Sequence, residues 1–223
     1  MGLLNAISRL LLFKMKREEI LQFDRSHFAI GLVATWLVGM GRYWDDPGAS
    51  LLQHLGLGSV IYIFLLATFI WMILLPFRIE NWNYFTVLTF ISLTSFPAVF
   101  YAIPVERFTS IDTANTINVC FLAIVAFWRL ALLYQFLKVF TRLPTWNIVV
   151  VSFMPICLII ATLTILNLHR VVFNVMGGLR EPSAHDGTYF ILLILTGASL
   201  ILSIPLVLGY IVAVYQSRKT RKQ

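Results

Sequence analysis

Apolar residues fall into six long runs that short polar stretches separate. A membrane-spanning helix needs about 20 predominantly apolar residues. The runs predict spans over residues 28–44, 58–77, 84–103, 117–140, 148–168 and 189–215. The sequence therefore predicts an all-α fold, a polytopic integral membrane bundle of six transmembrane helices over residues 27–216.

The first run is the shortest of the six. It holds three glycines and ends at Arg42, followed by Tyr43, Trp44, Asp45 and Asp46. A re-entrant segment, which enters and leaves the membrane on one side, has a similar pattern and would leave five crossings. The run itself leaves both interpretations open.

The positions of the positive charges favour six crossings. With a cytoplasmic N-terminus, 12 of the 17 Lys and Arg residues fall in inside segments and four in outside segments, and Arg129 falls within a span. Cytoplasmic loops of membrane proteins carry an excess of Lys and Arg. Five crossings would place the two basic ends on opposite sides. We therefore expect both termini in the cytoplasm, with residues 217–223 as a basic tail.

Residues 1–26 precede the first span and predict an amphipathic helix. Leu3, Ile7, Leu10 and Leu11 recur at helical spacing, with basic residues between them. Such a helix lies in the headgroup layer of a membrane, and a partner-binding helix is the alternative. The segment lacks the cationic start and the small-residue cleavage site of a removed signal peptide. Asp24 or Ser26 is placed to cap the first span.

Composition narrows the class of protein. Apolar residues make up 59% of the chain and charged residues 12%, against about 25% charged in ordinary globular proteins. This excludes a soluble enzyme, a disordered regulator and a disulfide scaffold. The net charge of +7 is concentrated near the two ends, which fits anionic lipid headgroups. We expect membrane lipids as partners, no nucleic acid, and a bacterial inner (plasma) membrane as the location.

Arg129 is the one basic residue well inside a span. It lies nine residues before Lys138, about 13 Å along a helix, and no predicted span contains Asp or Glu. A buried guanidinium usually faces protein or water and has a partner. In one hypothesis Arg129 donates a hydrogen bond to the backbone carbonyl of Val151 or Ile201. Each of these carbonyls lacks its helical donor, because the residue four positions later is a proline. The other hypothesis makes Arg129 a binding site for an anion, such as a lipid phosphate or a carboxylate.

Three spans contain a proline at least six residues from either end: Pro97, Pro155 and Pro205. Proline removes one helical hydrogen bond and tends to kink its helix. Thr94 and Ser95, just before Pro97, can bond nearby carbonyls where the ladder is broken. Three kinked spans would suit gating or a cavity, although such kinks are ordinary in membrane helices.

The remaining polar chemistry falls in the predicted outer loops. Five of these residues could bind a divalent metal or supply a general base: Asp45, Asp46, Glu106, His169 and His185. They are scattered over three loops without a metal-ligand spacing, so solvated loops and ion pairs at the membrane rim are the simpler interpretation. The sequence predicts no metal site, no cofactor and no catalytic residue.

Three functions remain open at this stage. The first is a non-catalytic component of a membrane complex, as a subunit, scaffold or assembly factor, with a membrane-protein partner or a second copy of the chain. The second is transport or lipid binding, as a channel or carrier for a small anion or lipid that uses Arg129. The third is a membrane-embedded enzyme with a site at the outer rim.

Overall fold

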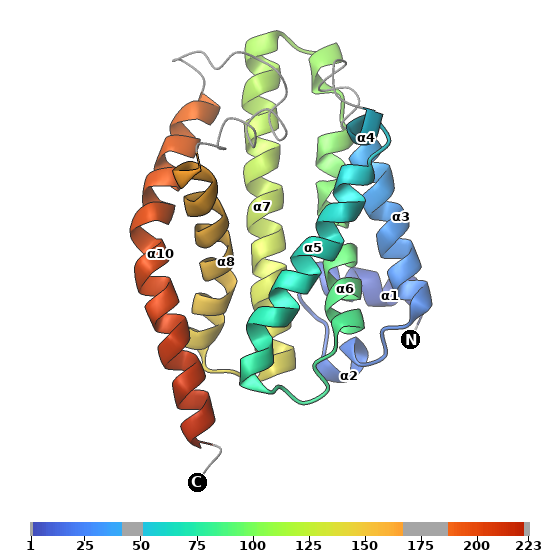
Figure 1. The fold of residues 1–223 in the computed structure, drawn as a ribbon. Helices are drawn as coiled ribbons and strands as arrows, with labels where there is room; N and C mark the ends of the chain where they lie inside the picture. Colours follow the sequence, from blue (N-terminus) through green and yellow to red (C-terminus); the bar gives the residue numbers. More distant parts are fainter. Residues whose placement is uncertain (1, 42–50, 167–186, 221–223) are drawn as a thin grey trace. The chain divides into compact units, whose positions relative to one another are not determined.

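The computed structural model describes residues 2–41, 51–166 and 187–220 (Figure 1). Every regular element within these ranges is a helix. The chain divides into two compact units, residues 1–143 and residues 144–223, and each is described by itself.

The first unit contains ten helical elements within its described ranges. In chain order they are α1 (Leu3–Leu11), α2 (Arg17–Ile20), α3 (Arg25–Gly41), α4 (Leu51–His54), α5 (Leu57–Leu74), η2 (Leu75–Phe77), α6 (Tyr84–Leu93), η3 (Phe96–Ala102), η4 (Val105–Arg107) and α7 (Ile111–Thr141). Elements labelled η are 3₁₀-helices. Within its described residues, the second unit is a pair of helices that pack against each other, α8 (Thr145–Ile165) and α10 (Gly187–Thr220).

Four helical stretches are long and apolar enough to cross a membrane: Leu57–Phe77, Thr116–Thr141, Thr145–Ile165 and Leu193–Lys219. Two predicted spans are shorter as helices. α3 has 17 residues, and the third predicted span is the shorter apolar stretch Tyr84–Phe100. The prediction of an all-helical membrane protein is therefore confirmed with four candidate spans, and the count of six stays a prediction.

The third predicted span is not one continuous α-helix. α6 ends at Leu93, and the chain continues as the 3₁₀-helix η3 from Phe96. Pro97 cannot donate a backbone hydrogen bond. Thr94 donates its hydroxyl to the Ile91 carbonyl at 2.7 Å, so a side chain binds a carbonyl close to the break. Pro155 and Pro205, by contrast, lie inside α8 and α10, which continue past them.

The N-terminal segment is also not one continuous helix. α1 ends where Phe13 adopts a left-handed conformation with φ of 60°. The Lys14 amide donates to the Arg9 carbonyl at 2.8 Å, and the Phe13 amide donates to Leu10 at 3.0 Å. These two bonds form a Schellman motif, which ends a helix and turns the chain. The chain then enters the short helix α2.

α3 begins at the cap that the sequence predicts. Asp24 Oδ1 accepts the backbone amides of Ser26 at 2.9 Å and His27 at 3.1 Å. These amides belong to the first turn, which has no helical acceptors of its own. The capping role predicted for Asp24 is therefore confirmed.

Small residues bring α3 close to its neighbours in the first unit. A β-carbon on Gly39 would lie 2.8 Å from Ser59 Oγ of α5, and one on Gly41 would collide with Ala102 of η3. Close approach through small residues is typical of membrane helices. It joins α3, α5 and the broken α6–η3 stretch into one packed group.

Aromatic rings join α6 to the C-terminal half of α7. Phe90 stacks on Phe136 with 4.0 Å between ring centroids, and Phe136 stacks on Phe140 at 5.6 Å. Trp82, just before α6, contacts both α7 rings. Phe90 and Phe140 are fully buried. This cluster fixes the part of α7 that follows Arg129 in the chain.

Candidate functional site

The α7 helix carries Arg129, whose side chain lies against α5. The guanidinium carbon is 6.0 Å from the centroid of the Tyr62 ring, a cation–π distance. Tyr62 lies 15 residues before Phe77, about 22 Å along a helix. Tyr62 is also five residues after Leu57, where α5 begins, so the contact lies in the N-terminal third of α5, whereas Arg129 is near the middle of the candidate span Thr116–Thr141.

The four candidate spans supply no carboxylate to balance this charge. The sequences of all four candidate spans lack Asp and Glu. The carbonyls of Val151 and Ile201 belong to the second unit, so the bond predicted between Arg129 and one of them stays a prediction. Within the first unit as described, the Tyr62 ring is the contact that Arg129 makes.

The surface of α7 around Arg129 is poorly covered. Within Thr116–Thr141, only 11% of an apolar stretch of 18 residues is buried. Phe127 is 76% exposed and Ile124 50% exposed. Arg129 thus stands on a helix whose apolar surface the described part of the first unit leaves largely uncovered.

The N-terminal segment docks on α7 directly beside Arg129. The Trp128 indole nitrogen donates to the Leu11 carbonyl at 3.2 Å. Six apolar residues of the segment are buried: Ala6, Ile7, Leu10, Met15, Ile20 and Phe23. Of the apolar face predicted for this segment, Ile7 and Leu10 are therefore covered by the protein itself, and Leu3 and Leu11 are half-buried.

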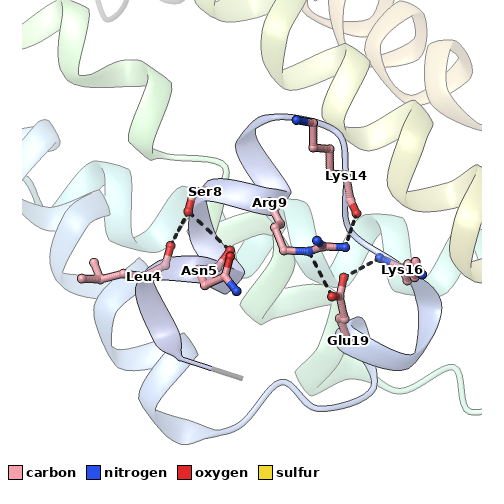
Figure 2. A network of polar contacts seen from close by, with 7 residues as sticks. All are labelled: Leu4, Asn5, Ser8, Arg9, Lys14, Lys16 and Glu19. Atoms are coloured by element: carbon pink, nitrogen blue, oxygen red, sulfur yellow. Dashed lines mark hydrogen bonds and ion pairs between the residues drawn. The ribbon is translucent and has the colours of Figure 1, made fainter.

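A polar network holds α1 to α2 (Figure 2). Arg9 Nε lies 3.0 Å from Glu19 Oε1, and Arg9 Nη2 donates to the Lys14 carbonyl at 2.9 Å. The Lys16 amide donates to Glu19 Oε2 at 2.8 Å. Sequence reasoning missed this network. The signal was Glu19 three residues after Lys16, the spacing at which a carboxylate binds back to the start of its helix.

A second contact ties α2 to the loop between α5 and α6. Arg17 Nη2 lies 3.3 Å from Glu80 Oε2 and 3.2 Å from the Glu80 carbonyl. Its guanidinium carbon lies 5.6 Å from the centroid of the Phe140 ring. Arg17 therefore joins three parts of the first unit that are distant in sequence.

A buried hydroxyl cluster lies where α6 breaks. Thr35 Oγ1 of α3 donates to the Gly31 carbonyl at 2.8 Å and lies 2.7 Å from Ser95 Oγ. Thr35 and Ser95 are both 4% exposed. Thr89, one turn before the break, has a buried hydroxyl that forms no hydrogen bond with any residue that the structure describes. Sequence reasoning identified Ser95 but missed Thr35, whose four-residue spacing from Gly31 was the available signal.

The start of α3 carries a titratable pair. His27 Nδ1 lies 2.7 Å from Asp24 Oδ1. Backbone and side-chain hydrogen bonds from His27 lower the pKa of Asp24 below its ordinary value. Because the Asp24 carboxylate also accepts amides of the first turn, its charge stabilises the beginning of the helix.

Most of the predicted outer-rim residues lie outside the part of the chain that the structure describes. Asp45, Asp46, His169 and His185 fall outside the described residues, and Glu106 lies in η4 with an undescribed side chain. Among the residues that the structure describes, no group of three or more His, Cys, Asp or Glu residues could hold a metal ion. The rim site stays a prediction.

Comparisons with protein-family models, with curated proteins and with solved structures find no match to this chain.

Proposed function

We propose that this chain is a non-catalytic component of a membrane complex, acting as a subunit, scaffold or assembly factor. Its partner contacts α7 around Arg129. The observation that carries the proposal is the position of Arg129, a charge at membrane depth that no carboxylate of the four candidate spans can balance.

The energetic argument concerns what surrounds the guanidinium. An arginine at the centre of a spanning helix costs about 2.5–3.5 kcal/mol on insertion scales. The contact with the Tyr62 ring returns about 2 kcal/mol when the pair is desolvated, which leaves part of this cost. A carboxylate on a partner helix would offset the rest, and a charged hydrogen bond of this kind also fixes how the two helices meet.

The partner is a different protein rather than a second copy. Another copy of this chain brings no Asp or Glu at the depth of Arg129, because the candidate spans lack both residue types. A different protein can supply the carboxylate that a second copy of this chain lacks at this depth. The exposed Phe127 and Ile124 beside Arg129 give such a partner an apolar surface to pack on.

The proposal includes the full membrane arrangement that the charges predict. α3 and the Tyr84–Phe100 stretch cross the membrane together with the four longer spans, and both termini are cytoplasmic. The distribution of 12 basic residues inside and four outside supports this arrangement. The N-terminal segment then lies at the inner leaflet of a bacterial inner membrane.

Photocrosslinking at Phe127 tests the proposal. A benzoylphenylalanine at this exposed position is expected to crosslink one discrete protein in the native membrane. Arg129→Leu should abolish that product, whereas Arg129→Lys should retain part of it. Lys138→Leu is the matched control, since it removes an exposed cation from the inner end of the same helix. Crosslinking to lipid alone in all variants would contradict the proposal.

A channel or carrier for a small anion or lipid is the second candidate. It is favoured by the half-buried position of Arg129 against the exposed Tyr62 ring, because the edge of a guanidinium can bind a phosphate or carboxylate with two hydrogen bonds. Anion or lipid flux into liposomes that contain the purified chain alone, lost in Arg129→Leu, would establish this candidate in place of the first.

A further inference from the structure

The turn between α1 and α2 holds two lysines in a fixed frame. The Lys14 carbonyl accepts from Arg9 Nη2 at 2.9 Å, and the Lys16 amide donates to Glu19 Oε2 at 2.8 Å (Figure 2). The stretch from Lys14 to Lys16 is therefore held at both ends by the Arg9–Glu19 ion pair. Both lysine residues are exposed.

The residue between these lysines faces the protein interior. Met15 is 6% exposed and lines a small apolar gap against α7. Leu10 and Phe13 form part of the same wall, and Leu132 and Phe136 of α7 line the opposite side. One short stretch of chain thus presents two cations to solvent and one thioether to an apolar surface.

The charges around this stretch favour an anion. Glu19 is already paired with Arg9 at 3.0 Å, and the nearest other carboxylate in sequence, Glu18, stands on the first turn of α2. The two apolar residues just before Lys14, Leu12 and Phe13, are 58% and 39% exposed. Cations beside exposed apolar side chains are the pattern by which amphipathic segments bind an anionic membrane surface.

We propose that Lys14 and Lys16 bind the phosphate of one anionic phospholipid, whose acyl chain lies along the exposed side chains of Leu12 and Phe13. The site goes beyond the proposed function, because it does not depend on Arg129 or on a protein partner. A phospholipid fits better than a small soluble anion, since these exposed apolar side chains directly precede the two lysines in the chain. The ion pair between Arg9 and Glu19 positions the two lysines without contacting the lipid.

The test is native mass spectrometry of the full chain from vesicles of phosphatidylglycerol mixed with phosphatidylcholine. The wild type is expected to retain one phosphatidylglycerol above the background of weakly held lipid. The double substitution Lys14→Gln and Lys16→Gln should reduce this bound form at least fivefold. The matched control, Arg218→Gln with Lys219→Gln, removes the same charge from the C-terminal end of α10 and should leave it unchanged.

The substitution Glu19→Ala distinguishes a defined lipid-binding site from non-specific electrostatic attraction of anionic lipid. This substitution makes the chain more positive, so simple electrostatics would raise the retention of anionic lipid. It also removes the acceptor that holds Arg9 and Lys16, so the proposed site should lose lipid. Helical circular dichroism would show that the variant remains folded.

Three results would overturn the proposal. Equal loss in the Lys14/Lys16 variant and the Arg218/Lys219 control would mean diffuse attraction to the basic ends. Increased retention in Glu19→Ala would mean the same. Equal binding of inorganic phosphate to the delipidated wild type, with no preference for phosphatidylglycerol, would identify a small-anion site instead.

Discussion

Gly31 of α3 lies directly against Ser92 of α6. A β-carbon added at Gly31 would stand 2.9 Å from the backbone carbonyl carbon of Ser92. Backbone cannot give way as a flexible side chain can, so α3 and α6 would have to separate. We predict that Gly31→Ala lowers the free energy of unfolding by about 1–3 kcal/mol, the usual range for overpacking, as measured by unfolding in detergent.

Gly58 provides the matched control for that substitution. It lies in the first turn of α5, and nothing surrounds the position of an added β-carbon within 4 Å. Alanine favours the helix over glycine by up to about 1 kcal/mol. Gly58→Ala should therefore be neutral or stabilising, and equal effects at both glycines would argue against close α3–α6 packing.

The buried hydroxyl cluster gives a second prediction. Thr35→Val keeps the shape of the side chain but removes the bonds to the Gly31 carbonyl and Ser95 Oγ. A buried polar group that loses its partner costs about 1–3 kcal/mol. We expect Thr35→Val to unfold at lower denaturant concentration than the wild type. Thr35→Ser, which keeps the hydroxyl, should recover most of the loss.

The sequence predicted the helices better than their interruptions. Runs of apolar residues located the candidate spans, because every backbone group in a bilayer has to bond within its own helix. The break after Leu93 depends on hydroxyls that bond nearby carbonyls, together with Pro97. Pro155 and Pro205 carry the same local signal inside continuous helices, so proline alone did not separate the two cases.

Candidate sites were predictable only where one residue carried the signal. Arg129 was identified because an arginine stands out in an apolar span. The Arg9–Glu19 pair and the Thr35 cluster were missed, because they depend on a turn at Phe13 and on two helices that are 60 residues apart in sequence. The pattern of apolar and polar residues along the chain predicts which face of a helix is apolar. It does not predict which two helix faces pack against each other.

The docking of the N-terminal segment gives a third prediction. Trp128→Phe keeps the ring but removes the hydrogen bond from Trp128 to the Leu11 carbonyl, worth about 1 kcal/mol. The detached population of the segment should rise roughly fivefold. Hydrogen exchange of peptides covering residues 3–13 would report this rise. Trp146→Phe, at a position 68% exposed in the second unit, is the control and should leave exchange there unchanged.

The Asp24 cap predicts a dependence on acidic pH. The pKa of Asp24 is lowered in the folded chain, chiefly by hydrogen bonds from His27, from an ordinary value of 3.8. The ionised carboxylate therefore adds stability above that ordinary value, and the contribution disappears as the pH falls through the lowered pKa. Asp24→Asn keeps an acceptor for the amides but lacks the charge.

The measurement for this prediction is the melting temperature of both proteins in detergent between pH 3 and pH 7. The wild type should exceed Asp24→Asn at neutral pH, and the difference should shrink below about pH 4. A difference that stays constant down to pH 3 would mean that the charge of Asp24 does not stabilise α3.

The central claim, that Arg129 serves assembly with a different membrane protein, is tested most directly by native mass spectrometry of the chain extracted gently from its own membrane. The account predicts a mass equal to this chain plus one other polypeptide in fixed stoichiometry, reduced in Arg129→Leu to the mass of the chain alone. A wild type that leaves the membrane alone or with copies of itself, with the same mass in Arg129→Leu, would contradict it.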